Sequence, residues 1–295
     1  MSIDNTIAVI IVNFNAGSLL TQCVHAAMNS TVSVIVYVID NGSTDESISQ
    51  LKQAIELDER VHIIRNNINY GFARAANQAL PQITSPYILF LNPDCLIKTD
   101  TLARFRETMK QYPQAGMAGG LVRNLDGSEQ AGCRRSIPSP WRSMVRVFHL
   151  DQLFPHHPRF QSFVLTDQPL PSQPVEIEGI SGACMFVRQT ALQEVGAMDE
   201  TYFLHGEDLD WFMRFRAHHW SILFIPEIEV THIKGACSRS QPLRVLWYKH
   251  RSMVRFYRKF FRRQYPFIMM VMVVIAVWIR FAILALVTFI TPQKP

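Results

Sequence analysis

Charged residues are scarce in this sequence, and acidic residues are absent from its last part. Of 295 residues, 18% are charged, against about 25% in a typical soluble domain. The last acidic residue is Glu229, so residues 1–229 hold 24 acids and 29 − 12 = 17 Lys+Arg, a net charge of −7. Residues 230–295 hold the other 12 basic residues and no acid, a net charge of +12. The chain is an acidic body with a basic, apolar tail, so we expect no nucleic-acid partner.

Cysteine is also rare, and several common signatures are missing. The five cysteines are widely spaced with no CxxC pair, which disfavours a zinc ribbon, a redox motif and a disulfide scaffold. Neither GxGxxG nor GxxxxGK[ST] occurs, which disfavours a dinucleotide fold and a P-loop enzyme. Residues 1–6 are polar and the apolar run 7–14 is too short for a signal peptide. We therefore expect the body to lie in the cytoplasm.

The end of the tail predicts a hydrophobic membrane segment at residues 265–291. Thirteen consecutive apolar residues occupy 267–279, Arg280 interrupts, and 281–290 resume with only Thr288 polar. As a helix these 24 residues would be about 36 Å long, whereas a bilayer core is about 30 Å thick. This length and composition favour a spanning helix. Arg280 is costly in lipid, however, so an interfacial helix and a buried helix both stay open.

The start of the tail predicts a basic amphipathic helix at residues 239–264. Its arginines share one helical stripe: Arg244, Arg251, Arg255, Arg258 and Arg262. Apolar residues occupy the opposite side: Met253, Val254, Phe256, Tyr257, Phe260 and Phe261. Such a helix suits an anionic membrane surface. If the next segment spans, the basic flank stays cytoplasmic.

The body alternates strand-like and helix-like segments. Short apolar runs at 7–14, 32–39, 61–65 and 87–91 predict strands, and helical patterns lie between them. This order predicts an α/β domain with a mostly parallel sheet, in which ligands bind at the carboxyl ends of the strands. Polar residues stand at those ends: Asn13, Asp40, Asn66 and Asp94. The proline-rich stretch 134–178 predicts an irregular excursion, which we assign to the acceptor side.

Two acidic motifs are candidates for chemistry. Asn92-Pro93-Asp94 follows the strand at 87–91, and a carboxylate there could hold Mg²⁺ against a diphosphate; a proline turn is the alternative. Glu207, Asp208 and Asp210 begin a helical segment. One of them could act as a general base, or all three could simply favour the helix N-terminus. The residues alone leave both pairs of readings open.

The ordered motifs resemble those of family 2 glycosyltransferases, and in particular the bacterial rhamnosyltransferase-like branch. The likeness covers about residues 5–235 and is carried by these segments: Ile10-Ile11-Val12-Asn13-Phe14-Asn15, Asp40-Asn41-Gly42-Ser43-Thr44-Asp45, residues 66–77, Leu91-Asn92-Pro93-Asp94, Gly182-Ala183-Cys184-Met185, Asp199-Glu200, and Gly206-Glu207-Asp208-Leu209-Asp210 with Arg214. The resemblance implies a Rossmann-like, nucleotide-sugar-binding GT-A domain, here residues 1–238. It also implies transfer of a sugar from a nucleotide diphosphate with inversion.

The resemblance also implies roles for particular residues. The nucleotide-sugar site would be formed by Asn13, Asn15, Asp40, Asn66, Gly71, Asn77 and Asn92. Asp94 would bind a divalent metal, Mg²⁺ or Mn²⁺, with His232 as a further metal or diphosphate contact. An ordinary surface or core histidine is the alternative for His232. The family's DxD-type motif reads Asn92-Pro93-Asp94 here, so its first carboxylate is absent.

Inversion requires a base for the acceptor hydroxyl. By family position Asp208 is the first candidate and Glu207 the second. Asp210 would orient the helix or a neighbouring residue. Arg214 could contact phosphate or clamp the acid cluster, and we favour the clamp. We expect no site residue beyond His232.

The leading hypothesis is a rhamnosyltransferase that uses dTDP-L-rhamnose and a lipid-linked saccharide acceptor. It would act at the cytoplasmic face of the bacterial inner membrane, in surface polysaccharide (O-antigen or cell wall) synthesis. Three alternative donors are UDP-galactofuranose, UDP-glucose and UDP-N-acetylglucosamine. A non-catalytic GT-A scaffold of a polysaccharide-assembly complex is a further alternative, and an oligomer is left open.

Overall fold

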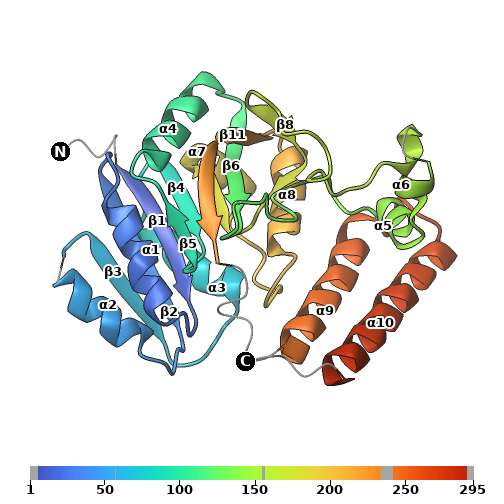
Figure 1. Ribbon diagram of the computed structural model, residues 1–295, viewed down its shortest axis with the longest axis horizontal. Coiled ribbons are helices and arrows are strands. Elements are labelled where there is room, and N and C mark those ends of the chain that lie inside the picture. The colour runs from blue at the N-terminus through green and yellow to red at the C-terminus, as the bar shows by residue number, and fades with distance from the viewer. Residues whose placement is uncertain (1–5, 57, 155–156, 234–241, 291–295) are drawn as a thin grey trace.

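The computed structural model describes residues 6–56, 58–154, 157–233 and 242–290, which form one α/β body and a C-terminal helix pair (Figure 1). The strands are β1 (Ile7–Asn13), β2 (Val34–Asn41), β3 (Val61–Asn66), β4 (Tyr87–Leu91), β5 (Cys95–Ile97), β6 (Ala115–Arg123), β7 (Arg134–Arg135), β8 (Val175–Ile177), β9 (Gly179–Ile180), β10 (Cys184–Arg188) and β11 (Ser221–His232). The helices are α1 (Ser18–Met28), α2 (Ser47–Ile55), α3 (Phe72–Asn77), α4 (Thr101–Gln111), α5 (Pro140–Val147), α6 (Leu150–Leu153), α7 (Gln189–Val195), α8 (Glu207–Ala217), α9 (Pro242–Phe260) and α10 (Phe267–Ile290).

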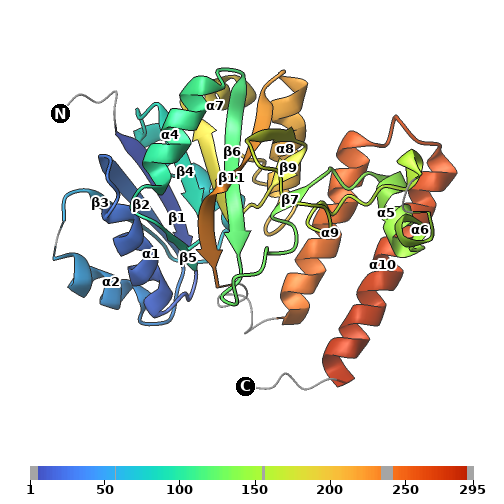
Figure 2. The same cartoon turned by 45° about the horizontal axis from the view of Figure 1, so that its top comes forward.

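The main sheet has the order β3-β2-β1-β4-β10-β6-β11-β5, and β8 also pairs with β11. Strands β3, β2, β1 and β4 are all parallel. Beyond them β10 runs antiparallel between β4 and β6, while β6 and β11 are parallel neighbours (Figure 2). The α/β prediction is confirmed. The parallel register pairs Asn13 with Asp40, so the polar ends of these strands meet at one edge of the sheet.

Helices cover both faces of the sheet, because its strands are apolar on both sides. Alternate residues of β1 point to opposite faces. Ile7, Val9 and Ile11 belong to the core under α1, α2 and α4, while Ala8 and Ile10 belong to the core under α3, α7 and α8. Burial on both faces explains why β1 reads as an unbroken apolar run.

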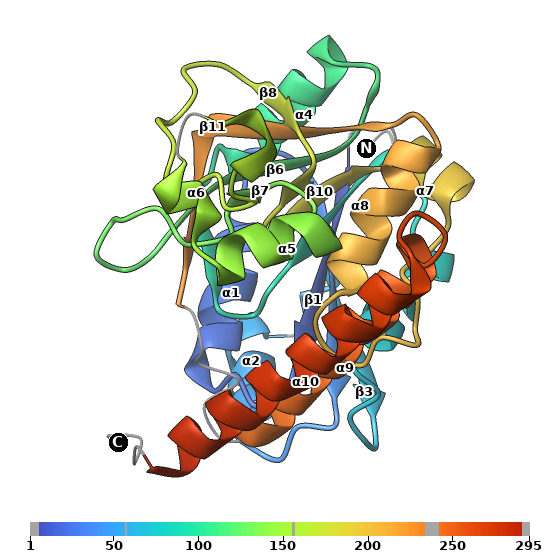
Figure 3. The same ribbon diagram turned by 90° about the vertical axis from the view of Figure 1, so that its right-hand side faces the viewer.

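The stretch 134–178 is irregular, as predicted, and its described part holds only short elements. Two of them, α5 and α6, lie beside the C-terminal helix pair (Figure 3). Ser143 of α5 and Tyr257 of α9 are joined by a hydrogen bond of 2.6 Å between their hydroxyl oxygens. The excursion therefore reaches the tail of the chain.

Helix α9 is part of the body's core. Its arginines at 244, 251, 255 and 258 are exposed, as the stripe predicted. Its apolar side is covered by protein, however, since Phe256, Tyr257 and the following Phe261 join the core that contains Trp211. The helix thus offers its basic side, not its apolar side, to an outside partner. The expected boundary at residue 238 and residues 239–241 lie outside the described residues.

Helix α10 packs lengthwise on α9 (Figure 3). Met270 and Val273 are buried in the same core, and the Trp247 and Trp278 ring centroids are 4.9 Å apart. The outer face carries a continuous exposed apolar stripe: Ile268, Met272, Ile275, Ile279, Ile283, Leu286 and Ile290. By length and composition the helix could cross a membrane, and only 11% of its apolar window is buried. A buried core helix is therefore disfavoured.

Candidate active site

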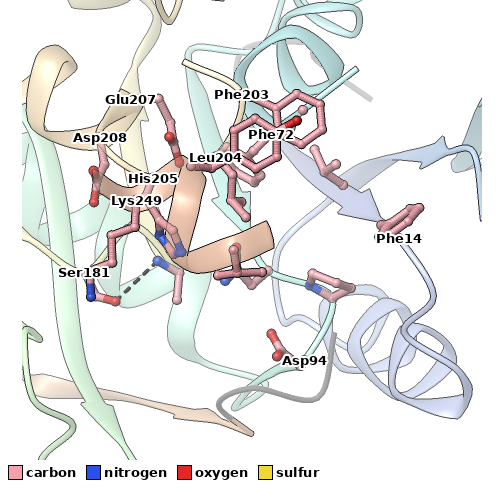
Figure 4. A pocket seen from close by; sticks show the side chains of 18 of the residues that line it. Phe14, Phe72, Asp94, Ser181, Phe203, Leu204, His205, Glu207, Asp208 and Lys249 are labelled. Atoms are coloured by element: carbon pink, nitrogen blue, oxygen red, sulfur yellow. Dashed lines mark hydrogen bonds between the residues drawn. The ribbon is translucent and has the colours of Figure 1, made fainter. Parts of the chain in front are cut away.

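A cavity of about 460 Å³ opens at the carboxyl ends of β1 and β4. Figure 4 shows Asp208 and Glu207 at one end of this cavity and Phe14 at the other, with Asp94 on a separate wall. Its polar and charged lining comes from strands β2, β7 and β11, from the loops after β3, β4, β6 and β9 and before α8, and from helices α8 and α9. These residues are Asn41, Asn69, Asn92, Asp94, Gln130, Arg135, Ser181, His205, Glu207, Asp208, His232, Arg244, Tyr248 and Lys249.

A turn with an unusual backbone conformation precedes α8 and places Glu207 and Asp208 at the cavity. His205 and Gly206 both have positive φ, at 64° and 89°, a conformation that is strained for residues other than glycine. Opposite this turn, a Cβ on Gly182 would lie 3.0 Å from the Asp208 carboxylate. The glycine therefore makes room for Asp208.

The environments of the two neighbouring acids differ. Glu207 is 8% exposed, and among the described residues its Oε2 has no hydrogen-bond partner. Burial, and secondly the charge of Asp208, raise the pKa of Glu207 above its ordinary value. Asp208 instead pairs with the Arg135 guanidinium through Oδ2 and accepts from the Leu209 backbone N–H through Oδ1, at 2.8 Å. The pair thus combines a carboxyl group that favours its neutral form with a carboxylate held in an ion pair.

Asp94 and His232 form a candidate metal site. His232 Nε2 lies 3.1 Å from Asp94 Oδ1, and His232 Nδ1 lies 2.7 Å from Gln130 Oε1. The Gln130 amide nitrogen donates to Asn124 at 2.9 Å, so its oxygen is free to accept from Nδ1–H. In this tautomer Nε2 carries the lone pair and could bind a metal ion beside Asp94, while Nδ1–H donates to Gln130, as is usual for histidines that ligate a metal.

Cys95 could offer a third ligand atom beside this pair, but a thiol is a softer ligand than Mn²⁺ and Mg²⁺ prefer. Cys95 is fully buried, and burial raises the pKa of its thiol well above the ordinary value. The remaining carboxylate and imidazole suit Mn²⁺ or Mg²⁺, which complete their shells with phosphate oxygens and water.

Three predicted nucleotide-binding residues form a turn beside the cavity rather than its wall. Asn13 is fully buried, and its amide donates to the Ser47 hydroxyl at 2.9 Å and to Ser43 at 3.0 Å. Asp40 accepts from the Ser43 backbone N–H at 3.2 Å. Asn15 accepts from the backbone N–H of Thr44 at 2.8 Å. These bonds fix the ends of β1 and β2.

Of the other predicted nucleotide-binding residues, some hold neighbouring loops in place and others line the cavity. Asn66 bonds to Asn41 and to Gln78, and Asn77 donates to the Met198 carbonyl at 2.9 Å, so both support neighbouring loops. Gly71 does line the cavity. Its φ is +86°, and an added Cβ would lie 2.3 Å from the Phe203 carbonyl oxygen. The backbone at Gly71 therefore lies so close to Phe203 that no side chain fits there.

Sequence reasoning missed several wall residues. Asn41 lies next to the predicted Asp40 and could have been found by strand alternation, and Arg135 lies in the excursion. We expected no site residue beyond His232, but the cavity wall extends further along the chain, to four residues of α9: Arg244, Val245, Tyr248 and Lys249. No motif in the sequence marks these four residues.

The predicted clamp behind the acids is present. Arg214 Nε donates to Asp210 Oδ1 at 2.8 Å, and Lys259 of α9 reaches Asp210 Oδ2 at 2.5 Å. Asp210 is fully buried, so these two cations compensate its charge. Helix α8 is thereby tied to α9 directly behind the cavity.

Comparison with known proteins identifies the family. The family model described as "Glycosyl transferase family 2" matches residues 8–196. An N-acetylglucosaminyl-diphospho-decaprenol L-rhamnosyltransferase of Mycobacterium tuberculosis is 26% identical over 230 residues, which are 74% of this chain and 73% of that protein.

Solved structures share the fold at lower identity. A mannosyltransferase of Pyrobaculum calidifontis in complex with GDP-Man and Mn²⁺ has a TM-score of 0.59 at 15% identity, over 88% of this chain and 65% of its own. GalNAc-T7 with UDP, GalNAc and Mn²⁺ has a TM-score of 0.61 at 17% identity, over 86% of this chain and 50% of its own. The chain therefore belongs to glycosyl transferase family 2 and is a glycosyltransferase with the GT-A fold.

Proposed function

We propose that this enzyme transfers L-rhamnose from dTDP-rhamnose, with inversion, to a lipid-linked saccharide acceptor. The observation that carries inverting transfer is the position of Asp208, an ion-paired carboxylate across the cavity from the Asp94–His232 pair. The rhamnosyltransferase relative, matched over about three quarters of both chains, supports this sugar and this type of acceptor. The product would be a bacterial surface saccharide.

The chemistry is a single displacement at the anomeric carbon. The acceptor hydroxyl oxygen forms the new bond to that carbon and gives its proton to the Asp208 carboxylate, while the bond to the diphosphate oxygen breaks and the nucleoside diphosphate leaves. Arg135 holds Asp208 in one orientation, so the base is positioned before the substrate arrives. Neutral Glu207 would donate a hydrogen bond and not act as the base.

The nucleotide diphosphate would bind at the ends of β1, β2 and β4. Asp94 and His232 would hold a divalent metal, Mg²⁺ or Mn²⁺, and the two structural neighbours solved with Mn²⁺ support this. When bound, the metal would offset charge on the leaving diphosphate. Asn41, Asn69 and the backbone at Gly71 are the groups best placed to contact the nucleotide sugar.

The tail would keep the enzyme at the cytoplasmic face of the inner membrane. The exposed apolar stripe of α10 would contact lipid, and the arginines of α9 would face anionic headgroups. An acceptor whose lipid tail lies in the same membrane would then be concentrated at the cavity.

A donor panel tests the proposal. Release of nucleoside diphosphate is measured for dTDP-rhamnose, UDP-galactofuranose, UDP-glucose and UDP-N-acetylglucosamine, with and without a lipid-linked acceptor. We expect acceptor-dependent release from dTDP-rhamnose, its loss in Asp208→Asn with donor binding retained, and substantial turnover in the control Glu207→Gln. Acceptor-dependent release from another donor would refute the sugar assignment, and none from any donor would favour the scaffold.

A further inference from the structure

A second cavity lies beside the active site, between α9, α10 and the loop before α8. Its volume is about 930 Å³. One wall is basic and comes from α9: Arg251, Arg255, Arg258 and Lys259. Trp278 of α10 and Glu200 of the loop also line it. We call this cavity the basic groove.

Two of the four cations in the basic groove are already held in ion pairs. Lys259 reaches Asp199 at 2.7 Å, and Arg255 reaches the same carboxylate at 3.3 Å. Arg251 and Arg258 are exposed, and neither has a hydrogen bond or ion pair within the described part of the chain. Glu200 accepts a hydrogen bond of 3.1 Å from Asn77. The groove thus presents two unpaired guanidinium groups, about two helical turns apart on α9.

The basic groove adjoins both the active site and the apolar tail. Phe203 and Tyr248 line both cavities, and their stacked rings, with centroids 4.2 Å apart, form the border between them. On its other side the groove is lined by Trp278 of α10. The nearby residues Ile275 and Ile279 belong to the exposed apolar stripe of that helix. A molecule that ran from the stripe to Asp208 would cross the groove.

We propose that the basic groove binds the diphosphate of the lipid that carries the acceptor sugar. This rests on the proposed function, since it requires a lipid diphosphate acceptor. A diphosphate esterified at both ends carries two negative charges, which matches the two unpaired guanidinium groups, and guanidinium binds phosphate in a bidentate manner. The lipid chain then lies along α10, and the sugar passes the aromatic border, which offers it an apolar ring face.

The test uses the full chain and the double variant Arg251→Gln/Arg258→Gln. The matched control is Arg262→Gln/Arg263→Gln, which removes the same charge from exposed residues that line neither cavity. Acceptors are N-acetylglucosaminyl diphosphate on a farnesyl chain, and octyl N-acetylglucosaminide, which lacks the diphosphate. We expect the groove variant to raise KM for the diphosphate acceptor by about 10- to 100-fold, with little change for octyl N-acetylglucosaminide or for the donor. The control should change none of these.

The outcomes separate the groove from its alternatives. If the unmodified enzyme uses neither acceptor, the proposed function fails. If it uses the diphosphate acceptor but both double variants raise its KM equally, the arginines act only through general surface charge and the groove proposal is overturned. Binding to vesicles of 30% phosphatidylglycerol supplies the second arm. If the groove variant weakens that binding and leaves acceptor KM unchanged, the groove holds phospholipid headgroups and the proposal is also overturned.

Discussion

The buried carboxyl group of Glu207 provides a pH-dependent test of the site. Burial and the charge of Asp208 raise the pKa of Glu207 above its ordinary value of 4.5 in the folded chain. In the unfolded chain the group returns to that ordinary value. Between the two values this group binds one more proton in the folded state than in the unfolded state, so its contribution to stability falls as pH rises.

The magnitude follows from proton linkage. One proton changes the free energy of unfolding by about 1.4 kcal/mol per pH unit. The stabilisation is fully present below pH 4.5 and is lost as pH rises through the raised pKa of the folded state. For a chain of this size, that change in the free energy of unfolding lowers Tm by about 3 °C per pH unit. Glu207→Gln removes the titrating group but keeps the shape of a neutral carboxyl. The Tm of this variant should therefore lack the fall with pH that Glu207 causes.

The assay is thermal unfolding of the full chain in detergent between pH 5 and 8. The quantity of interest is the Tm of Glu207→Gln minus that of the unmodified protein, which we expect to rise steadily with pH. Glu59→Gln is the control, because Glu59 is exposed and its substitution should give a flat difference. A flat difference for Glu207→Gln would show that Glu207 is ionised throughout, and would remove the argument that favours Asp208 as the base.

Three further predictions test the metal, a glycine and the tail. Asp94→Ala should weaken donor binding and abolish the response of activity to Mn²⁺ or Mg²⁺, measured by donor titration with and without metal; full activity of the unmodified enzyme in EDTA would refute the metal site. Gly71→Ala should lower stability by about 1–3 kcal/mol or more, because its Cβ would meet the Phe203 carbonyl; Gly127→Ala, with positive φ in open space, should have a smaller effect on Tm. The full chain should stay on membranes in high salt until detergent is added, whereas a chain ending at Gln264 should be released by salt and melt earlier, since Met270 and Val273 leave the core; release of the full chain by salt alone would show that α10 is not inserted.

The sequence by itself determined the architecture and the chemical identity of the main acids. Apolar runs followed by polar residues predicted the strands and the edge at which ligands bind, and these depend on local pattern. Asp94, Glu207 and Asp208 were predicted because each stands where a strand ends or a helix begins, and all three line the cavity. The motif order also matched the family.

Only the tertiary structure decided which side chains face the cavity. Asn13 and Asp40 were predicted to contact the nucleotide sugar, but their side chains form hydrogen bonds within a turn beside the cavity. Asn41, one residue further along β2, lines the cavity wall. Adjacent residues in a strand point to opposite sides, so a motif places a backbone segment but not the direction of each side chain. Arg135 pairs with Asp208 across 73 residues of sequence, a contact that no local pattern contains.

The role of α9 was likewise decided by packing. Its helical periodicity predicted one basic and one apolar side, and both are present. Periodicity gives the polarity of each side but not what covers it, since lipid and a protein core bury the same side chains for the same reason. Here Phe256 and Tyr257 pack into the body, and this brings Tyr248 and Lys249 to the cavity wall. The fold thereby makes part of the predicted membrane helix into part of the site.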